Sequence, residues 1–289
     1  MNFVQKISVY LEFMRYKNCA MAGVSALAAV FISAFILDYS VNENLFYIVQ
    51  HLLYIFFMVF LVTGAGNMLN DYYDVEIDKV NKPDRPLPSG RIGLKEAFHL
   101  TIACFLIALL LSIIITPMAM VIGFVNIFIL IWYAKSLKRT ILIGNLTIAY
   151  LTGSTFLFGA SLFGIEGIYV LLPLALLAFL ATAAREIVKD IEDIEGDSKD
   201  GAVTFPIKFG EKPAILLASA FGFLAVLLSP LPYFAGTLTV HYLYAVFFGI
   251  LCFFYAIYTL IAKRDYAKSS KFFKIAMFLA LIAFAFGLF

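Results

Sequence analysis

The stretch EAFHLTIACFLIALLLSIIITPMAMVIGFVNIFILIWYA, residues 96–134, decides the fold of this chain. A helix needs about 20 apolar residues to cross the roughly 30 Å hydrocarbon core of a bilayer, so this stretch is too long for one span. Pro117 closes one helix and opens the next, because a proline lacks the N–H that a helix interior requires. We therefore expect two spans here, at residues 96–115 and 118–134.

Apolar runs of similar length recur along the whole chain. The 289 residues are 63% hydrophobic and only 14% charged, which is too apolar for a soluble protein with one core. The sequence predicts an all-α, multi-pass membrane bundle that forms a single domain over residues 1–289. Its nine expected spans lie at residues 18–37, 45–70, 96–115, 118–134, 141–163, 166–188, 213–231, 239–262 and 271–288.

The basic residues test this number of spans, because Lys and Arg in short loops stay on the cytoplasmic side of a membrane. With nine spans and an inside N-terminus, all 21 Lys and Arg residues fall inside, and the outer side has none. They lie within residues 6–17, 79–95, 135–139, 185–212 and 263–274. The sequence therefore predicts a cell-membrane protein with a cytoplasmic N-terminus and a C-terminus outside.

Residues 1–17 have a different pattern from the spans. Apolar residues recur at roughly helical spacing there, among the cations Lys6, Arg15 and Lys17. Such an amphipathic segment is typical of a helix that lies in the plane of the membrane surface. We expect an interfacial helix on the cytoplasmic side.

Ten of the 19 acidic residues lie in two short windows. The string D-x-x-D-x-E-x-D occurs at residues 71–78 and again at residues 190–197. Both copies end a predicted span at the cytoplasmic face, on the second and sixth helices. This pattern indicates an internal repeat related by an axis along the membrane normal.

Each acidic motif has the composition of a metal site. Its aspartates are spaced i, i+3 and i+7 and share one face if the helix continues through the motif. In the first motif Asn70 adds a neutral oxygen to the same face. Carboxylates so close together repel one another unless a cation neutralises them, and all-oxygen ligands favour Mg²⁺. The alternatives are a solvated acidic helix end and a cation permeation site, although the spans themselves are almost uncharged.

Basic residues follow the acidic motifs. Lys82, Arg85 and Arg91 belong to a stretch with three prolines and a glycine in the nine residues 83–91, which predicts a stiff loop. Lys138 and Arg139 follow the aromatic Tyr133. Because arginine matches phosphate oxygens, we expect Mg²⁺ to bridge the carboxylates to a diphosphate that these cations also bind.

Asn145-Leu146-Thr147 matches the pattern of a glycosylation acceptor. It lies at the cytoplasmic start of a predicted span, where no glycosylation takes place. The sequence therefore assigns it no function.

The two acidic motifs resemble the signatures of the UbiA superfamily of intramembrane prenyltransferases. Residues 70–78, N-D-Y-Y-D-V-E-I-D, resemble the first signature, and residues 189–197, K-D-I-E-D-I-E-G-D, resemble the second. Residues 81–90 and 133–139 also look like family elements. The resemblance implies nine helices around a central cavity, capped on the cytoplasmic side by the loops after the second and sixth helices.

The same resemblance implies the site residues. Two Mg²⁺ ions would be held by Asn70, Asp74, Asp78, Asp190, Asp193 and Asp197, and the five aspartates of this set and Asp71 would be the catalytic acids. The phosphates of the substrates would be bound by Lys82, Arg85, Arg91, Lys138, Arg139 and Lys189. The rings of Tyr72, Tyr73 and Tyr133 would stabilise the allylic cation that remains when the diphosphate departs.

The acceptor is indicated by residues 185–197 and by Thr204-Phe205-Pro206, which look most like the archaeal branch that makes membrane ether lipids. This resemblance implies transfer of a geranylgeranyl group from its diphosphate to geranylgeranylglyceryl phosphate. One alternative is a prenyltransferase of the same fold that acts on an aromatic acid or quinone precursor. The others are a divalent-cation transporter and a CDP-alcohol phosphotransferase, although the D-G-x-x-A-R signature of that last class is missing here.

Overall fold

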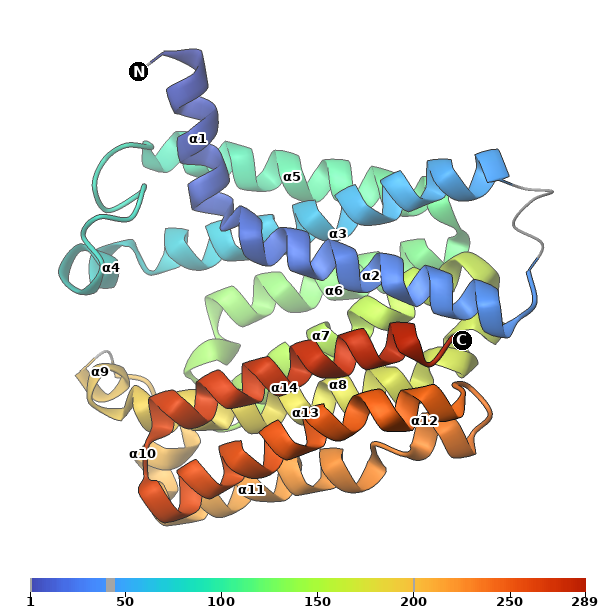
Figure 1. Ribbon diagram of the computed structural model, residues 1–289. Coiled ribbons are helices and arrows are strands. Elements are labelled where there is room, and N and C mark those ends of the chain that lie inside the picture. Colours follow the sequence, from blue (N-terminus) through green and yellow to red (C-terminus); the bar gives the residue numbers. More distant parts are fainter. Residues whose placement is uncertain (1, 40–44, 200) are drawn as a thin grey trace. The chain divides into compact units, whose positions relative to one another are not determined.

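The computed structural model describes residues 2–39, 45–199 and 201–289, and every regular element in these ranges is helical (Figure 1). This confirms the predicted all-α class. The long helices are α2 (Tyr16–Ile36), α3 (Leu45–Tyr73), α5 (Leu94–Ile115), α6 (Pro117–Lys135), α7 (Ile143–Ala160), α8 (Gly164–Glu192), α11 (Glu211–Leu228), α13 (Val240–Tyr258) and α14 (Tyr266–Phe286). The short ones are α1 (Phe3–Met14), α4 (Val75–Asn81), η1 (Leu137–Arg139), η2 (Ser161–Phe163), α9 (Ile194–Lys199), α10 (Phe205–Phe209), α12 (Leu231–Phe234) and the π-helical η3 (Thr259–Lys263).

Eight segments of the described chain are long and apolar enough to cross a membrane. The longest, Ile143–Glu192, has 50 residues and contains both α7 and α8, which are separated by η2. α8 begins at Gly164, whose φ is +67°. Each of the nine predicted spans therefore corresponds to one long helix. The protein is a multi-pass membrane protein.

The boundary between α5 and α6 lies where the sequence predicts it. Pro117 is the first residue of α6. The N–H at this position makes no hydrogen bond within a helix, so a proline can occupy it without losing one. The hydroxyl of Thr116 accepts a hydrogen bond from the N–H of Ala119 at 3.0 Å and caps the helix. Two short spans form here because Thr116 caps the start of α6 and Pro117 occupies its first position, so both residues favour a new helix at this point.

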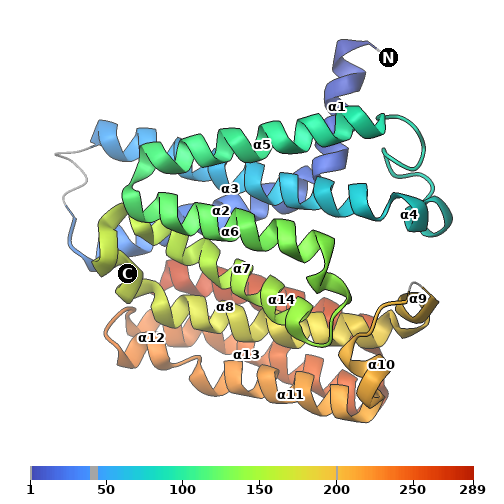
Figure 2. The same cartoon turned by 180° about the vertical axis from the view of Figure 1, so that it is seen from behind.

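The described chain divides into two compact units. The first contains residues 2–30, 45–136 and 158–165, and the second contains residues 31–39, 137–157, 166–199 and 201–289. In the first unit α3 packs along α5, and both contact α6, as Figures 1 and 2 show from opposite sides. α1 turns away from the direction of α2 and packs against α3. The core of the first unit includes Phe13, Met58, Met68 and Phe105.

The second unit is built around α13, which packs against α14 and α11. Its core includes Ile187 and Val188 of α8, Leu260 and Phe273. α7 and α8 approach each other closely at Gly153, where an added Cβ would lie 2.7 Å from the carbonyl oxygen of Ala175. Small residues at such contacts let the backbones of membrane helices come together.

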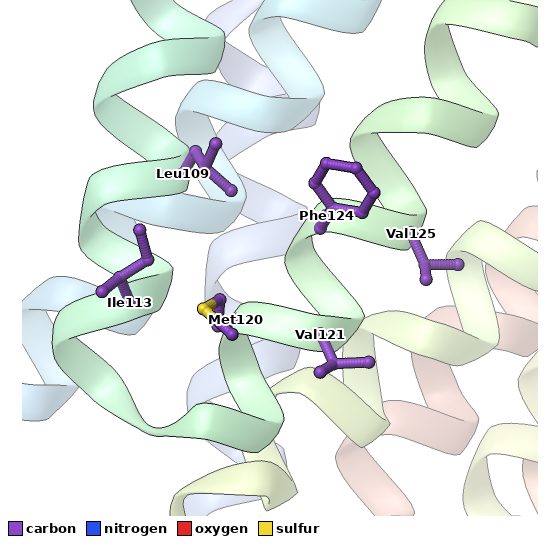
Figure 3. Close-up of a pocket in the computed structure, with 6 residues that line it drawn as sticks. All are labelled: Leu109, Ile113, Met120, Val121, Phe124 and Val125. Atoms are coloured by element: carbon purple, nitrogen blue, oxygen red, sulfur yellow. The ribbon is translucent and has the colours of Figure 1, made fainter.

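An apolar groove of about 390 Å³ lies on the first unit, at the end of α5 and the start of α6 (Figure 3). None of the described residues that line it has a polar side chain, so these residues offer no group that would bind a diphosphate. A surface of this composition is suited to contact with lipid chains. Its lining residues are Leu109, Ile113, Met120, Val121, Phe124 and Val125.

Candidate active site

The first acidic motif lies where α3 ends. α3 stops at Tyr73, Asp74 has φ −96° and ψ 7°, and α4 begins at Val75. Hydrogen bonds continue across this break, because the N–H of Asp74 donates to the carbonyl of Asn70 at 3.0 Å and the N–H of Asp78 donates to the carbonyl of Asp74 at 2.8 Å. The motif is not one continuous helix, but these three residues retain their four-residue hydrogen-bonded spacing.

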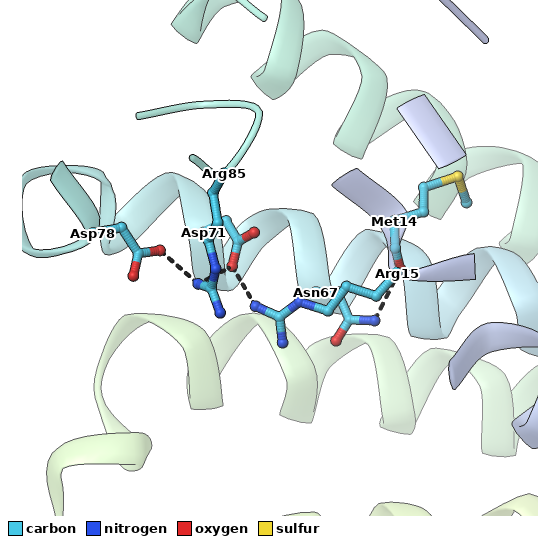
Figure 4. A network of polar contacts seen from close by, with 6 residues as sticks. All are labelled: Met14, Arg15, Asn67, Asp71, Asp78 and Arg85. Carbon is cyan, nitrogen blue, oxygen red and sulfur yellow. Dashed lines mark hydrogen bonds and ion pairs between the residues drawn. The ribbon is translucent and has the colours of Figure 1, made fainter. Parts of the chain in front are cut away.

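Two arginines bind the carboxylates of this motif (Figure 4). Arg85 donates from Nη1 to Asp71 Oδ1 at 3.0 Å and to Asp78 Oδ2 at 2.6 Å. Arg15 donates from Nη2 to the same oxygen of Asp71 at 2.5 Å. The side chains of Asp71 and Asp78 are only 4% and 6% exposed, and carboxylates at this depth need charged partners. Arg85 therefore bridges two aspartates of the motif.

Arg15 is a site residue that sequence reasoning missed, because the sequence shows it only as one cation of the N-terminal helix. It follows α1 with a φ of +56°, a left-handed conformation that costs a non-glycine residue about 1–2 kcal/mol. At this turn the amide of Asn67 donates to the carbonyl of Met14 at 3.0 Å. No local signal in the sequence connects Arg15 to Asp71, which lies 56 positions away.

The loop after the first motif has the irregular backbone that its prolines predict, with no helix in residues 82–93. Arg91 extends from it to α1, where its Nη1 and Nη2 each lie 2.7 Å from a carboxylate oxygen of Glu12. This guanidinium holds the pKa of Glu12 below its usual value. Lys82 is exposed and has no ion-pair partner within the described residues.

The second acidic motif repeats the helix break of the first. α8 ends at Glu192, Asp193 lies in a turn, and α9 begins at Ile194. The N–H of Asp193 donates to the carbonyl of Lys189, and the N–H of Asp197 donates to that of Asp193, both at 2.9 Å. The repeated string therefore has the same backbone course in both places.

Asp190, which corresponds to Asp71 in the repeat, is bound by an amide. Asn145 of α7 is buried and donates from Nδ2 to Asp190 Oδ2 at 2.8 Å. One turn before Asp190, Glu186 accepts hydrogen bonds from Arg185 and Lys189, each at 2.9 Å. Sequence reasoning missed Asn145; the only available signal was a polar residue near the start of an apolar span.

The remaining predicted residues lie on α3, α6 and η1. The ring centroid of Tyr72 lies 5.7 Å from the ring centroids of Tyr73 and Phe98. Tyr133 is half-buried on α6. Lys138 and Arg139 form η1, and the carbonyl of Arg139 accepts from the N–H of Val203 at 3.1 Å. This bond ties the connection between α6 and α7 to the segment that follows the second motif.

No three His, Cys, Asp or Glu side chains gather into a preassembled metal site within residues 2–39, 45–199 and 201–289. The first motif nevertheless fits a hard cation. Asn70 Oδ1 is buried and accepts no hydrogen bond from any described residue, which costs about 1–3 kcal/mol unless another group satisfies it. The oxygens of Asn70, Asp74 and Asp78 are of the kind that Mg²⁺ prefers.

Residues 21–282 match the model of the UbiA prenyltransferase family. The chain is a member of the UbiA family. It is therefore a prenyltransferase, as the two motifs indicated, and neither a transporter nor a CDP-alcohol phosphotransferase.

Relatives within the UbiA family cover nearly the whole chain. The digeranylgeranylglyceryl phosphate synthases of Methanosarcina barkeri and Methanosarcina mazei are 53% and 51% identical to it, over 97% of this chain and 98% of each relative. A solved structure of a digeranylgeranylglyceryl phosphate synthase has a TM-score of 0.82 and 39% identity, over 98% of this chain and 99% of that chain. A UbiA homologue from Archaeoglobus fulgidus bound to GPP and Mg²⁺ shares the fold, with a TM-score of 0.65 and 17% identity over 96% of this chain and 98% of that one.

Proposed function

We propose that this enzyme transfers a geranylgeranyl group from geranylgeranyl diphosphate to the free glycerol hydroxyl of geranylgeranylglyceryl phosphate, a step of archaeal ether-lipid synthesis. The observation that carries the proposal is the identity of 51–53% to two digeranylgeranylglyceryl phosphate synthases over 97% of the chain. The charges of the site support it, because acids for a metal and cations for phosphate follow one another along the chain.

The reaction breaks the bond between the allylic C1 and the diphosphate oxygen, and the bonding electrons leave with the diphosphate. The acceptor hydroxyl oxygen attacks C1 and forms the ether bond, and its proton leaves for the departing diphosphate. Mg²⁺ held by the carboxylates of the motifs would neutralise charge on the diphosphate and so make it a better leaving group. The rings of Tyr72, Tyr73 and Tyr133 are proposed to stabilise the allylic cation.

The carboxylates have distinct proposed roles. Asn70, Asp74 and Asp78 bind one Mg²⁺, and Asp190, Asp193 and Asp197 bind the other. Asp71 fixes the two arginines that contact it. Because Arg85 uses only Nη1 for Asp71 and Asp78, its Nη2 and Nε remain available for phosphate oxygens. Lys82, Arg91, Lys138, Arg139 and Lys189 supply the remaining positive charge.

The proposed active site lies on the cytoplasmic side of the membrane, with the N-terminus inside and the C-terminus outside. The positions of all 21 Lys and Arg residues support this orientation. α1 supports the interfacial placement of the N-terminal helix, because Val9 and Phe13 pack into the first-unit core while Val4, Ile7 and Leu11 are exposed on the other side of the helix. An exposed apolar stripe of this kind is stable where it contacts the membrane surface.

The proposal is tested with purified protein, Mg²⁺ and radiolabelled geranylgeranyl diphosphate. We expect label to enter lipid when geranylgeranylglyceryl phosphate is present, and no transfer to 4-hydroxybenzoate. Rapid transfer to 4-hydroxybenzoate, and none to the prenylglyceryl phosphate, would instead assign the enzyme to the aromatic-acceptor prenyltransferases.

A further inference from the structure

Two polar groups on α8 lack hydrogen-bond partners in the described part of the chain. Nε of Arg185 and Oγ1 of Thr182 are both buried and make no hydrogen bond to any described residue. The two residues are three positions apart, so their side chains lie on the same face of the helix. Thr182 is only 4% exposed, and an unsatisfied hydroxyl at this depth destabilises the fold unless a ligand satisfies it.

The unused hydrogen-bond donors of Arg185 favour an anion. Arg185 donates from Nη1 to Glu186 Oε1, and Lys189 donates to Glu186 Oε2, both at 2.9 Å. Two cations therefore contact one carboxylate, and Asp190 also acts on Lys189, so the unused donors of Arg185 and not a net charge favour an anion. Arg185 has five N–H donors and uses only Nη1 for Glu186, so an acceptor-only group such as a phosphate matches the donors that remain.

The position along α8 distinguishes this pair from the second acidic motif. Arg185 precedes Asp190 by five residues, or about 7.5 Å of helix, and Thr182 lies about 4.5 Å further on. Both residues thus lie within a segment that is long and apolar enough to span a membrane. A charge in such a segment is costly to keep, and it is typical of a site that binds a polar group within the membrane.

We propose that Arg185 and Thr182 bind the phosphate monoester of the acceptor. This inference rests on the proposed function, in which the acceptor carries a phosphate and the donor carries a diphosphate. The guanidinium binds phosphate oxygens through Nε and Nη2, and the threonine hydroxyl donates a further hydrogen bond. The acceptor hydroxyl, only a few bonds from the phosphate, is then held at one depth relative to the second motif, while the prenyl chain of the acceptor remains among apolar side chains.

The test compares two acceptors, geranylgeranylglyceryl phosphate and its dephosphorylated form, in the wild type and in Arg185→Gln and Thr182→Val. We expect the KM for the phosphorylated acceptor to rise about 10- to 100-fold in Arg185→Gln, because a hydrogen-bonded charge is lost. The preference for the phosphorylated acceptor in kcat/KM should fall by the same factor. The KM for geranylgeranyl diphosphate should be unchanged in Arg185→Gln.

Thr182→Val separates binding from folding. The substitution removes an unsatisfied hydroxyl and retains the shape of the side chain, so we expect an unchanged or higher Tm together with a higher KM for the phosphorylated acceptor. Lys263→Gln is the matched control for loss of a positive charge in the same unit, because Lys263 is exposed at the end of η3.

A binding measurement completes the test without turnover. Titration of glyceryl phosphate bearing one geranylgeranyl chain into the detergent-solubilised wild type, without donor, should give heat that is lost in Arg185→Gln. If the wild type transfers no prenyl group to this acceptor, the proposed function is wrong. If the wild type does so and Arg185→Gln keeps its phosphate preference, or if only the donor KM rises, the assignment of Arg185 and Thr182 is overturned.

Discussion

The two acidic motifs share a backbone course and differ in what binds their carboxylates. Each begins on a long helix that stops one residue before the central aspartate, Asp74 or Asp193. In the first motif Asp71 contacts two guanidinium groups. In the second, Asp190 accepts a hydrogen bond from the neutral amide of Asn145.

This difference shows which properties of the motif are local. The repeated string D-x-x-D-x-E-x-D produces the same helix break and the same hydrogen bonds twice, so these depend on the string itself. The partners of the carboxylates lie outside the string and differ between the copies. Arg85 comes from the loop after the first motif, whereas Arg15 and Asn145 come from distant parts of the chain. The first motif is therefore expected to depend on buried charge pairs, and the second on an amide that fixes the direction of one carboxylate.

The largest expected effect tests whether the two motifs are equivalent in catalysis. Asp74→Asn and Asp193→Asn should each lower kcat by on the order of 100-fold or more, because each removes a charged ligand of one proposed Mg²⁺. Glu76→Gln and Glu195→Gln are the matched controls, since both glutamates are exposed members of the same motifs. Wild-type turnover in only one of the two aspartate variants would show that a single motif holds the catalytic metal.

The second prediction concerns the buried charges of the first motif. Arg85→Gln leaves the carboxylate of Asp78 buried without its cation, and this should destabilise the Mg²⁺-free protein by about 3–5 kcal/mol. Thermal unfolding in detergent measures the change, and added Mg²⁺ should restore part of the loss. Arg91→Gln, which breaks a more exposed pair, should cost about 1 kcal/mol or less. Equal losses in both variants would contradict the assignment of Arg85 as a bridge.

A third, smaller effect is expected at the second motif. Asn145→Leu removes the donor to Asp190 and should weaken metal binding about tenfold, as the loss of a group that orients a ligand generally does. Electron paramagnetic resonance of bound Mn²⁺ measures this affinity without turnover.

The control for the amide is Thr147→Val, because the hydroxyl of Thr147 donates to the carbonyl of Ile143 on its own helix. In an Asp190→Asn background, Asn145→Leu should have no further effect on Mn²⁺ affinity. A further loss there would mean that Asn145 acts on the fold in general and not through Asp190.

The smallest effect shows how far the charge network of the first motif extends. The pKa of Glu12 is lowered from 4.5 by Arg91, so the pair stabilises the protein above about pH 4.5 and loses this contribution as the pH falls through the lower pKa of the folded state. Both side chains are more than a third exposed, which limits the effect to about 1 kcal/mol or less. The difference in Tm between the wild type and Glu12→Gln should therefore shrink between pH 7 and about pH 3. A constant difference would show that the carboxylate charge is irrelevant.

The sequence predicted the spans because a long apolar run has few alternatives to a membrane helix. Thr116-Pro117 separated two spans correctly, since capping and proline geometry act over a few residues. Both acidic motifs could be recognised in the sequence because each also consists of only a few neighbouring residues. Their short helix breaks could not be recognised, because the spacing i, i+3 and i+7 fits a continuous helix equally well.

The contacts of Arg15 and Asn145 could not be predicted from the sequence. Each joins residues that are 56 or 45 positions apart, and such pairing depends on how helices pack. Arg15 looked like one of many surface cations, and Asn145 like part of an irrelevant glycosylation pattern. A polar residue beside an apolar span was the only local indication in either case.

The turn at Arg15 has a practical consequence for anyone who shortens or tags this enzyme. Residues 2–15 resemble a dispensable tail, yet Glu12 and Arg15 contact Arg91 and Asp71, and Tyr10 donates to Glu96 at the start of α5. Removing them would leave a buried acid of the first motif with one cation in place of two. A tag at the N-terminus therefore keeps the contact with Asp71 only if residues 2–15 are retained.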